Sequence, residues 1–306
     1  MSAQPARRPR RPIDGVLLLD KPYGITSQAA VTRAKSMLGA AKAGHTGTLD
    51  PMATGLLPLA FGEATKFAQA LLDADKSYLA TVRLGITTTT GDLEGEVLTT
   101  LPVEVDRERI DAAVGQFRGE IEQMPPMYSA LKHAGKPLYE YARAGTEIAR
   151  TARRITIKAL EVEGWAGADL RINVACSKGT YVRVLAEDIG RALGCGATLA
   201  ALRRTRVGRF SVDDALSLDT LTAMSEAEIV AGLLPVDALL EGVPSLELDA
   251  DQSQRMRLGQ AVVLARGLDA GLVRVYGPGS SFLGVAEASA EGRLLPRRLI
   301  SEASKA

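Results

Sequence analysis

The sequence predicts an α+β fold, in which a large domain with a central antiparallel or mixed sheet is followed by a small β-rich C-terminal domain. Strand-like and helix-like segments follow one another without the regular βαβ rhythm of a doubly wound fold. After about residue 242 the pattern changes to short alternating segments separated by glycine and proline. The length of 306 residues suits one large domain and one small domain.

The composition is that of a globular protein with a sizeable core, since 46% of the residues are hydrophobic and 24% are charged. Apolar runs such as residues 16–19 are far too short to span a membrane. The arginine-rich N-terminus lacks the apolar stretch of a signal peptide. We therefore expect a cytoplasmic protein, and nothing in the sequence indicates an obligate protein partner or anything larger than a monomer.

Cysteine and histidine are too scarce to suggest a disulfide or a metal centre. The two cysteines, Cys176 and Cys195, form no CxxC pair, and the chain has only two histidines. A zinc site needs about four such ligands at close spacing. We expect no structural disulfide and no bound metal.

Positive charge is concentrated in two segments, although the formal net charge is only +1. The first eleven residues hold four arginines and no acid, and residues 203–209 hold another four arginines and no acid. Both segments could face phosphate groups. A solubilising tail and a solvated helix end are the alternatives that the sequence leaves open.

The first elements can be placed from local patterns. Residues 1–12 mix proline and arginine without periodicity, which predicts a disordered basic arm. The large domain is expected at 13–243, and it begins with a buried strand at 15–19. Ser27 can cap the following helix, which runs to about residue 38. The later elements of this domain follow from the same criteria, and they are a strand at 78–85, a helix at 106–117 and two strands at 155–162 and 170–176.

A long basic insertion is predicted at about 123–154. This stretch has few regular apolar repeats, contains three prolines and carries more lysine and arginine than acid. Beyond the large domain, residues 244–306 are expected to form the small C-terminal domain. Its alternating strands are predicted at 261–264, 272–276 and 282–286.

The densest polar motif is GHTGTLDPMATG, residues 44–55. Within it, Asp50 followed by Pro51 is typical of a helix start, with the carboxylate accepting N–H bonds and the proline at the first helical position. A carboxylate held there stays ionised and can also act as a nucleophile or a base. His45 is either a hydrogen-bonded loop residue or a catalytic or base-contacting ring.

A second motif, CSKGTYVR at residues 176–183, joins the end of a strand to the start of a helix, with Thr180 as a plausible cap. Arg183 lies off the apolar stripe of that helix. It could form a surface ion pair with Glu187, four residues further on. Alternatively, it could pair with Asp50 and orient that carboxylate.

Tyr78 opens the strand predicted at 78–85. An aromatic residue at this place can be a packing residue at the edge of a sheet. In a nucleic-acid enzyme the same ring would serve as a stacking platform for an extruded base, an interaction worth on the order of 1–3 kcal/mol. The residues alone do not separate these two roles.

Six segments in order together resemble the TruB family of tRNA pseudouridine synthases. They cover most of residues 13–210, and any one of them alone would be a weak signal. The resemblance implies a mixed α+β catalytic domain on a central antiparallel sheet, with a PUA-like RNA-binding domain at the C-terminus. The matching segments are LLLDKPYGITS, AGHTGTLDPMATGLLPLAFGEATKF, DKSYLATVRLGITTTTGDLEG, PPMYSALKHAGKPLYEYARAG, CSKGTYVRVLAEDIGRALGCGA and LRRTRVGRF.

At the matched positions, the resemblance implies three catalytic residues. Asp50 would be the catalytic aspartate, Tyr78 would stack on the target base, and Arg183 would pair with Asp50. The reaction moves the attachment of uracil to ribose from N1 to C5, with no net oxidation and no group added. It therefore needs no metal and no cofactor, and the sequence gives no sign of a site for either.

The resemblance also implies a tRNA substrate, with position 55 of the T loop as the target uridine. His45 would enter the T loop, while Tyr181 and Leu202 would line the uracil pocket. The insertion at 123–154 would close over the RNA stem-loop. Because an unstacked loop base is easier to extrude than a paired one, an isolated T-arm stem-loop is expected to suffice as substrate.

Two other functions remain as alternatives. The protein could be a non-catalytic RNA-binding protein or tRNA-folding chaperone, and a chaperone role could also accompany catalysis. It could instead be a synthase of the same type that acts on another RNA with a T-loop-like fold. The presence of Asp50, Tyr78 and Arg183 together favours catalysis.

Overall fold

The computed structural model describes residues 10–240, 242–264 and 269–301. Most of the predicted N-terminal arm, residues 1–9, lies outside these ranges. Arg11, near the end of the predicted arm, forms a bridge with Ala40, in which its N–H donates to the carbonyl of Gly39 at 2.9 Å. Arg11 also forms an ion pair with Glu226.

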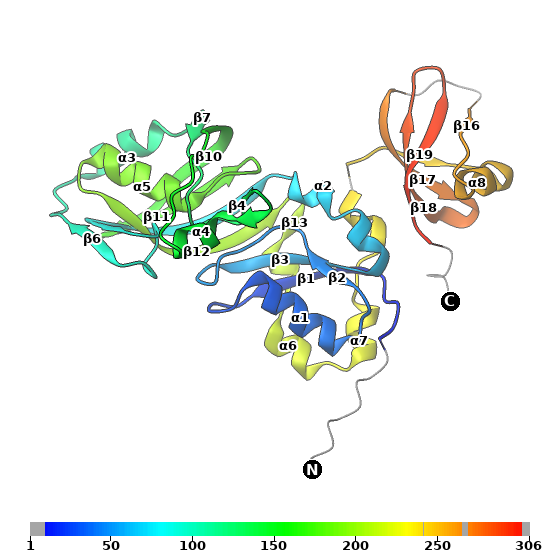
Figure 1. Ribbon diagram of the computed structural model, residues 1–306, viewed down its shortest axis with the longest axis horizontal. Helices are drawn as coiled ribbons and strands as arrows, with labels where there is room; N and C mark the ends of the chain where they lie inside the picture. The colour runs from blue at the N-terminus through cyan, green and yellow to red at the C-terminus, as the bar shows by residue number, and fades with distance from the viewer. Residues whose placement is uncertain (1–9, 241, 265–268, 302–306) are drawn as a thin grey trace, which may run out of the picture.

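The large domain is built on one mixed sheet, which confirms the predicted α+β class (Figure 1). Most neighbouring strands are antiparallel, while the pairs β1–β14 and β12–β3 are parallel. Two short strands lie off the main path, namely β2 (Ala43–His45) beside β3 and β13 (Phe210–Ser211) beside β12. The main path in spatial order is β14 (Leu216–Ser217), β1 (Gly15–Lys21), β3 (Thr54–Phe61), β12 (Ala197–Val207), β4 (Lys76–Leu84), β11 (Asp169–Cys176), β10 (Arg153–Ala166) and β7 (Gly119–Gln123).

Five helices pack into a single core on one face of this sheet. In Figure 1, α1, α6 and α7 gather beside β1 and β3, while α3 and α5 lie together towards the other end. The alternation of β1 explains this arrangement, because Leu17 and Leu19 join the helix-side core while Val16 and Leu18 face a second core. The five helices are α1 (Ser27–Met37), α3 (Arg107–Gly115), α5 (Val182–Leu193), α6 (Leu218–Ala223) and α7 (Glu226–Ala231).

The second core lies on the opposite face and reaches the C-terminal domain. Phe67 and Phe210 belong to it, together with Val285 of the C-terminal sheet. The elements that cover this face are short, and they are η1 (Gly62–Lys66), α2 (Gln69–Leu72), η2 (Val212–Asp214) and η3 (Val236–Leu240).

The C-terminal sheet forms a separate lobe at the right of Figure 1 and has its own core. The Phe67 and Phe282 rings meet edge to face across the junction, with centroids 5.5 Å apart. The Tyr276 hydroxyl donates to Asp237 at 2.6 Å, which ties the lobe to η3. The order in the sheet is β15 (Ser245–Glu247), β17 (Gly271–Gly277), β18 (Ser281–Ala288), β19 (Arg293–Leu299) and β16 (Val262–Val263), accompanied by α8 (Ala250–Arg257) and η4 (Pro278–Ser280).

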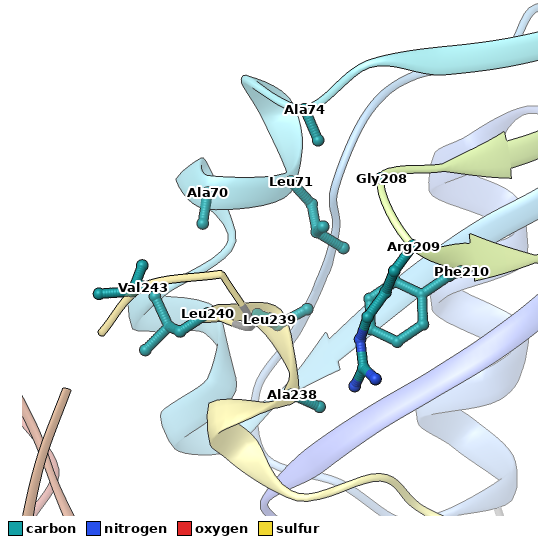
Figure 2. Close-up of a pocket in the computed structure, with 10 residues that line it drawn as sticks. All are labelled: Ala70, Leu71, Ala74, Gly208, Arg209, Phe210, Ala238, Leu239, Leu240 and Val243. Carbon is teal, nitrogen blue, oxygen red and sulfur yellow. The ribbon is translucent and has the colours of Figure 1, made fainter. Parts of the chain in front are cut away.

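A small cavity of about 190 Å³ lies in the large domain between α2, the turn from β12 to β13 and η3. Figure 2 shows Leu71 of α2, Phe210 of β13 and Leu239 of η3 around it. A second cavity of about 390 Å³ lies beside α5, near β5 (Ile86–Thr88) and β6 (Val97–Thr100). Neither cavity is lined by Asp50 or by any other residue of the predicted site.

The predicted insertion leaves the sheet after β7 and returns at β10. It holds a minimal hairpin of β8 (Lys132–His133) and β9 (Lys136–Pro137), followed by α4 (Leu138–Arg143). Two cation–π pairs form in it: Lys136 lies over the Tyr141 ring and Arg143 over the Tyr139 ring. These cation–π pairs hold the side chains of α4 against one another and against the hairpin.

The sequence interpretation was wrong at two helix caps. Thr26, not Ser27, caps α1, and its side chain accepts the N–H of Ala29 at 3.0 Å. Thr180 does not cap α5; the cap is Tyr181, without a side-chain bond, while the Thr180 hydroxyl donates to Ser177. At α1 both neighbouring residues, Thr26 and Ser27, carry a capping hydroxyl, whereas α5 begins one residue later than the Thr180 side chain would require.

The basic run at 203–209 is not a solvated helix end, because it lies in β12 and continues to β13. Arg203 pairs with Asp20 at 2.7 Å. Arg204 is only 2% exposed and therefore cannot reach the phosphate of a bound RNA. The run is part of a strand, and Arg204 within it is buried. A count of charges reveals neither feature.

Candidate active site

Asp50 lies in the loop between β2 and β3. The helix start expected from Asp50-Pro51 is absent: residues 51 and 52 form a turn, in which the Ala53 N–H donates to the carbonyl of Asp50 at 3.1 Å. The Asp50 side chain is 40% exposed, so its carboxylate can be reached by a substrate.

Arg183 supplies the ion pair that orients Asp50. It projects from the first turn of α5, its side chain is 6% exposed, and Nη2 lies 3.0 Å from Oδ2 of Asp50. The same guanidinium donates to the carbonyls of Thr90 at 3.0 Å and Tyr128 at 2.6 Å. Among the described residues, its ion pairs are with Asp50 and Asp92, not with Glu187.

Asp92 is a site residue that the sequence interpretation missed. Its buried carboxylate lies 3.8 Å from Nη1 of Arg183 and accepts the Thr90 hydroxyl at 2.6 Å. The Glu94 N–H donates to the same carboxylate at 3.2 Å. The Arg183 guanidinium therefore lies between the buried Asp92 carboxylate and the more exposed Asp50 carboxylate. These two ion pairs fix the orientation of the guanidinium plane. Asp92 lies between β5 and β6, within the segment DKSYLATVRLGITTTTGDLEG that carries part of the family resemblance, and that motif is the signal by which it could have been found.

Tyr78 and Arg204 face each other across neighbouring strands, since the register pairs Tyr78 of β4 with Arg204 of β12. Burial raises the pKa of the Tyr78 hydroxyl, and the Arg204 guanidinium opposes that shift. The phenol is therefore neutral at physiological pH. Arg204 also donates to three carbonyls, those of Leu56 at 2.7 Å, Gly47 at 3.1 Å and Thr48 at 3.4 Å.

Tyr181 lies two residues before Arg183 at the start of α5, and Leu202 lies in β12 two residues before Arg204. The Tyr181 backbone is held by Gln123, whose amide oxygen accepts the Tyr181 N–H at 2.7 Å and whose amide nitrogen donates to the Tyr181 carbonyl at 3.1 Å. Burial raises the pKa of Tyr181. Leu202 is partly buried beside β4, and its carbonyl accepts the Thr54 hydroxyl at 3.5 Å.

His45 ends β2, next to the loop that carries Asp50. Its Nδ1 accepts the Gly47 N–H at 3.3 Å, which leaves Nε2 as the protonated nitrogen of the neutral ring. Burial, aided by the Arg204 guanidinium, lowers the pKa of His45 below its usual value. At neutral pH this ring is uncharged and offers a single N–H donor.

Lys21 is a fully buried cation behind the Asp50 loop. Its ammonium donates to the carbonyls of Pro22 at 2.9 Å, Ile25 at 2.8 Å and Pro51 at 3.3 Å. Burial lowers the pKa of Lys21 to about 8, and the nearby Asp50 carboxylate opposes that shift. A cation at this place adds positive potential near the Asp50 carboxylate.

Across residues 10–240, 242–264 and 269–301, no group of three or more His, Cys, Asp or Glu side chains could hold a metal ion. Of the helices in these same ranges, none is long and apolar enough to cross a membrane. What the site offers is a reachable carboxylate, a guanidinium locked against it, a neutral phenol and a neutral imidazole. These groups suit proton transfer or nucleophilic attack on a bound substrate.

Comparison with protein families covers the chain in three parts. Residues 35–182 match the N-terminal domain of the TruB family of pseudouridylate synthases. Residues 183–241 match the C-terminal domain of tRNA pseudouridylate synthase B, and residues 244–300 match the C-terminal region of pseudouridine synthase II TruB.

Curated relatives match over nearly their whole length. A tRNA pseudouridine synthase B of Aromatoleum aromaticum is 58% identical, over 98% of this chain and 97% of that protein. The protein of the same name in Ralstonia nicotianae is 57% identical, over 97% of this chain and 98% of the relative. One from Burkholderia mallei is 55% identical, over 96% of each.

Solved structures agree on the architecture. A chain of an H/ACA ribonucleoprotein bound to a substrate RNA containing 2'-deoxyuridine superimposes with a TM-score of 0.70 at 25% identity, covering 94% of this chain and 85% of that one. A chain of a Cbf5-Nop10-Gar1 complex gives 0.70 at 27% identity, covering 94% and 84%. With a family match along its length and relatives above 50% identity, this chain belongs to the TruB family of pseudouridylate synthases.

Proposed function

We propose that this protein isomerises the uridine at position 55 in the T loop of tRNA to pseudouridine, with Asp50 as the catalytic carboxylate. The observation that carries the proposal is the pairing of Asp50 with the buried Arg183 at 3.0 Å, in a chain at least 55% identical to proteins named tRNA pseudouridine synthase B. The Asp50 side chain is 40% exposed, so a substrate can approach its carboxylate.

The reaction balances within the nucleotide. The N1–C1' bond of uridine breaks, the detached uracil turns, and a bond forms between C5 and C1'. C5 loses its proton and N1 gains one, so that the atoms of the product equal those of the substrate. Asp50 assists the cleavage of the glycosidic bond, and a closed site retains the uracil while it turns.

The other residues have supporting roles in this proposal. The neutral Tyr78 phenol stacks on the flipped base, and Tyr181 and Leu202 line the uracil pocket. Arg183 holds the Asp50 carboxylate in one orientation, with Asp92 fixing the far side of the guanidinium. No step requires a metal ion or an organic cofactor.

The RNA is read mainly by shape. The neutral His45 ring enters the T loop, where its single N–H can donate to a base or to the backbone. The insertion at 123–154 closes over the stem-loop. Two observations support this: the insertion carries aromatic and basic side chains close together, and its Tyr128 carbonyl accepts a hydrogen bond from the Arg183 guanidinium. The domain at 244–306 is proposed as a PUA-like module that binds the rest of the tRNA.

The test uses an unmodified T-arm transcript labelled with tritium at uracil C5, because formation of the new bond releases that label. Wild-type protein and Asp50→Asn are compared in the presence of EDTA, with RNA affinity measured in parallel. We expect tritium release by the wild type alone and similar affinity for both proteins, since the asparagine side chain keeps the shape of the aspartate and loses its charge.

Other outcomes separate the alternatives. If the wild type and Asp50→Asn both bind the RNA tightly and neither releases tritium, the protein binds RNA or assists tRNA folding without catalysing the reaction. Release from the whole tRNA but not from the isolated T arm would overturn recognition by shape. If Asp50→Asn assists tRNA folding as well as the wild type does, a chaperone role accompanies catalysis.

A further inference from the structure

The loop that carries Asp50 is held by three buried side chains, each from a different element. Arg204 of β12 binds the carbonyls of Gly47 and Thr48. Ser27 of α1 binds Leu49. Lys21 of β1 binds the carbonyl of Pro51. Arg204 and Lys21 each bond to further carbonyls outside this loop, whereas both bonds recorded for Ser27 go to Leu49.

The Ser27 hydroxyl makes both of its bonds to the residue that precedes Asp50. Its Oγ accepts the N–H of Leu49 at 2.8 Å and donates to the carbonyl of Leu49 at 3.0 Å. The side chain is 2% exposed, so water does not compete for either bond. This hydroxyl is available because Thr26, not Ser27, caps the helix.

The two bonds fix the two peptide planes on either side of the Leu49 Cα. The carbonyl of Leu49 belongs to the same peptide plane as the nitrogen of Asp50. When that plane is fixed, the direction in which the Asp50 side chain leaves the backbone is also constrained. We infer that Ser27 is a positioning residue for the reaction: its hydroxyl aims the Asp50 carboxylate at Arg183 and at the ribose of the target nucleotide.

The anchor is rigid because α1 is firmly packed. Ala30, Val31 and Ala34 of this helix are buried in the helix-side core, and the Leu49 side chain belongs to the same core. The Leu49 side chain thus places the loop near the helix, and the Ser27 hydroxyl sets the rotation of its peptides. Removing the hydroxyl keeps the packing and leaves a buried N–H and a buried carbonyl without a partner.

The inference rests on the proposed function, and its test separates the two. Single-turnover rates of tritium release at saturating enzyme, and dissociation constants for the T-arm RNA, are measured for wild type, Ser27→Ala, Ser27→Thr and Ser225→Ala. Ser225 is the matched control because it also stands at a helix start and its hydroxyl makes two hydrogen bonds with Glu228, but it caps α7 and lies away from the loop.

We expect Ser27→Ala to lower the single-turnover rate 10- to 100-fold, with the dissociation constant within about twofold of wild type, since misplacing a reacting group by about 1 Å can cost 10²-fold. Ser27→Thr, which keeps the hydroxyl, should recover most of the rate. Ser225→Ala should lose thermal stability without losing rate.

The inference is overturned if Ser27→Ala reacts as fast as Ser225→Ala. It is also overturned if its slower rate is matched by an equal loss of RNA affinity, or if Ser27→Thr is as slow as the alanine variant. Failure of the wild type itself to release tritium would count against the proposed function and not against the role of Ser27 alone.

Discussion

Arg183 shows how strongly one residue depends on its surroundings. Four residues before an acid on a helix, it resembles a surface ion-pair partner, yet its side chain is 6% exposed and touches Asp50, Asp92 and two backbone carbonyls. A guanidinium can serve all four acceptors because its donors diverge in one plane. A lysine has one nitrogen and cannot.

Arg183→Lys should therefore retain the fold and lose most of the activity. We expect the single-turnover rate to fall at least about 100-fold, because a charge-assisted pair that orients a reacting carboxylate is typically worth more than 2–3 kcal/mol. The matched control is Arg191→Lys on the same helix, where the side chain is 75% exposed and pairs only with Asp188 among the ion pairs described. A rate for Arg183→Lys close to that of Arg191→Lys would refute the orienting role.

At the scale of elements, the close packing of α5 against the turn that follows it depends on a glycine. Gly190 lies inside the helix, where the turn before β12 folds back so closely that the Gly196 N–H donates to the Gly190 carbonyl at 2.9 Å. A Cβ at position 190 would lie 2.2 Å from the nitrogen of Ala197. Helix propensity favours alanine over glycine by about 1 kcal/mol, so the close approach of the backbone explains why glycine stands there.

Gly190→Ala should consequently destabilise the protein by about 2–3 kcal/mol, against the sign that helix propensity predicts. Gly115→Ala is the matched control, because this glycine ends α3 and a Cβ there would meet no atom within 4 Å. That variant should be neutral or slightly more stable. Urea unfolding of both variants measures the difference, and equal midpoints would contradict the packing argument.

Elements with a clear local period were the ones the sequence predicted well. The strand predicted at 15–19 is β1, the helix predicted from residue 27 is α1, and the pair at 155–162 and 170–176 is β10 and β11. The interpretation missed β3 and β12, which are central to the sheet. β3 is apolar almost throughout because both faces are covered, and β12 contains a basic run, so neither shows the alternation of a half-buried strand.

At the scale of the whole molecule, the two lobes share apolar and polar contacts. Phe282 of β18 packs against Phe67 of the large domain, and Val285 belongs to the second core of that domain. The Ser301 N–H donates to Glu63 at 2.7 Å, and Lys66 donates to the carbonyl of Leu299 at 3.0 Å. These contacts favour one fixed arrangement of the lobes.

Removal of the Phe282 ring should make the two lobes unfold separately. Phe282→Ala removes two ring contacts, with Phe67 and with Tyr276, and should lower the stability by about 2–3 kcal/mol for this partly buried position. In scanning calorimetry we expect the C-terminal lobe to melt separately, below the main transition. Leu272→Ala, on the more exposed side of β17, should leave the trace unchanged. A single unshifted transition for Phe282→Ala would show that the lobes do not depend on this contact.

The sequence by itself determined the α+β class, the β-rich C-terminal region and the family resemblance, because periodicity, turn residues and ordered motifs are local properties of the chain. The turn that follows Asp50 was decided by the tertiary structure, since the sequence predicted a helix start there. Only the tertiary structure decided the partners of the buried polar groups. Arg204 bonds to Leu56, 148 residues away, and Ser27 to Leu49, 22 residues away. The sequence specifies the chemistry of each side chain. Whether a polar side chain faces solvent or a buried partner depends on which distant segments the fold brings beside it.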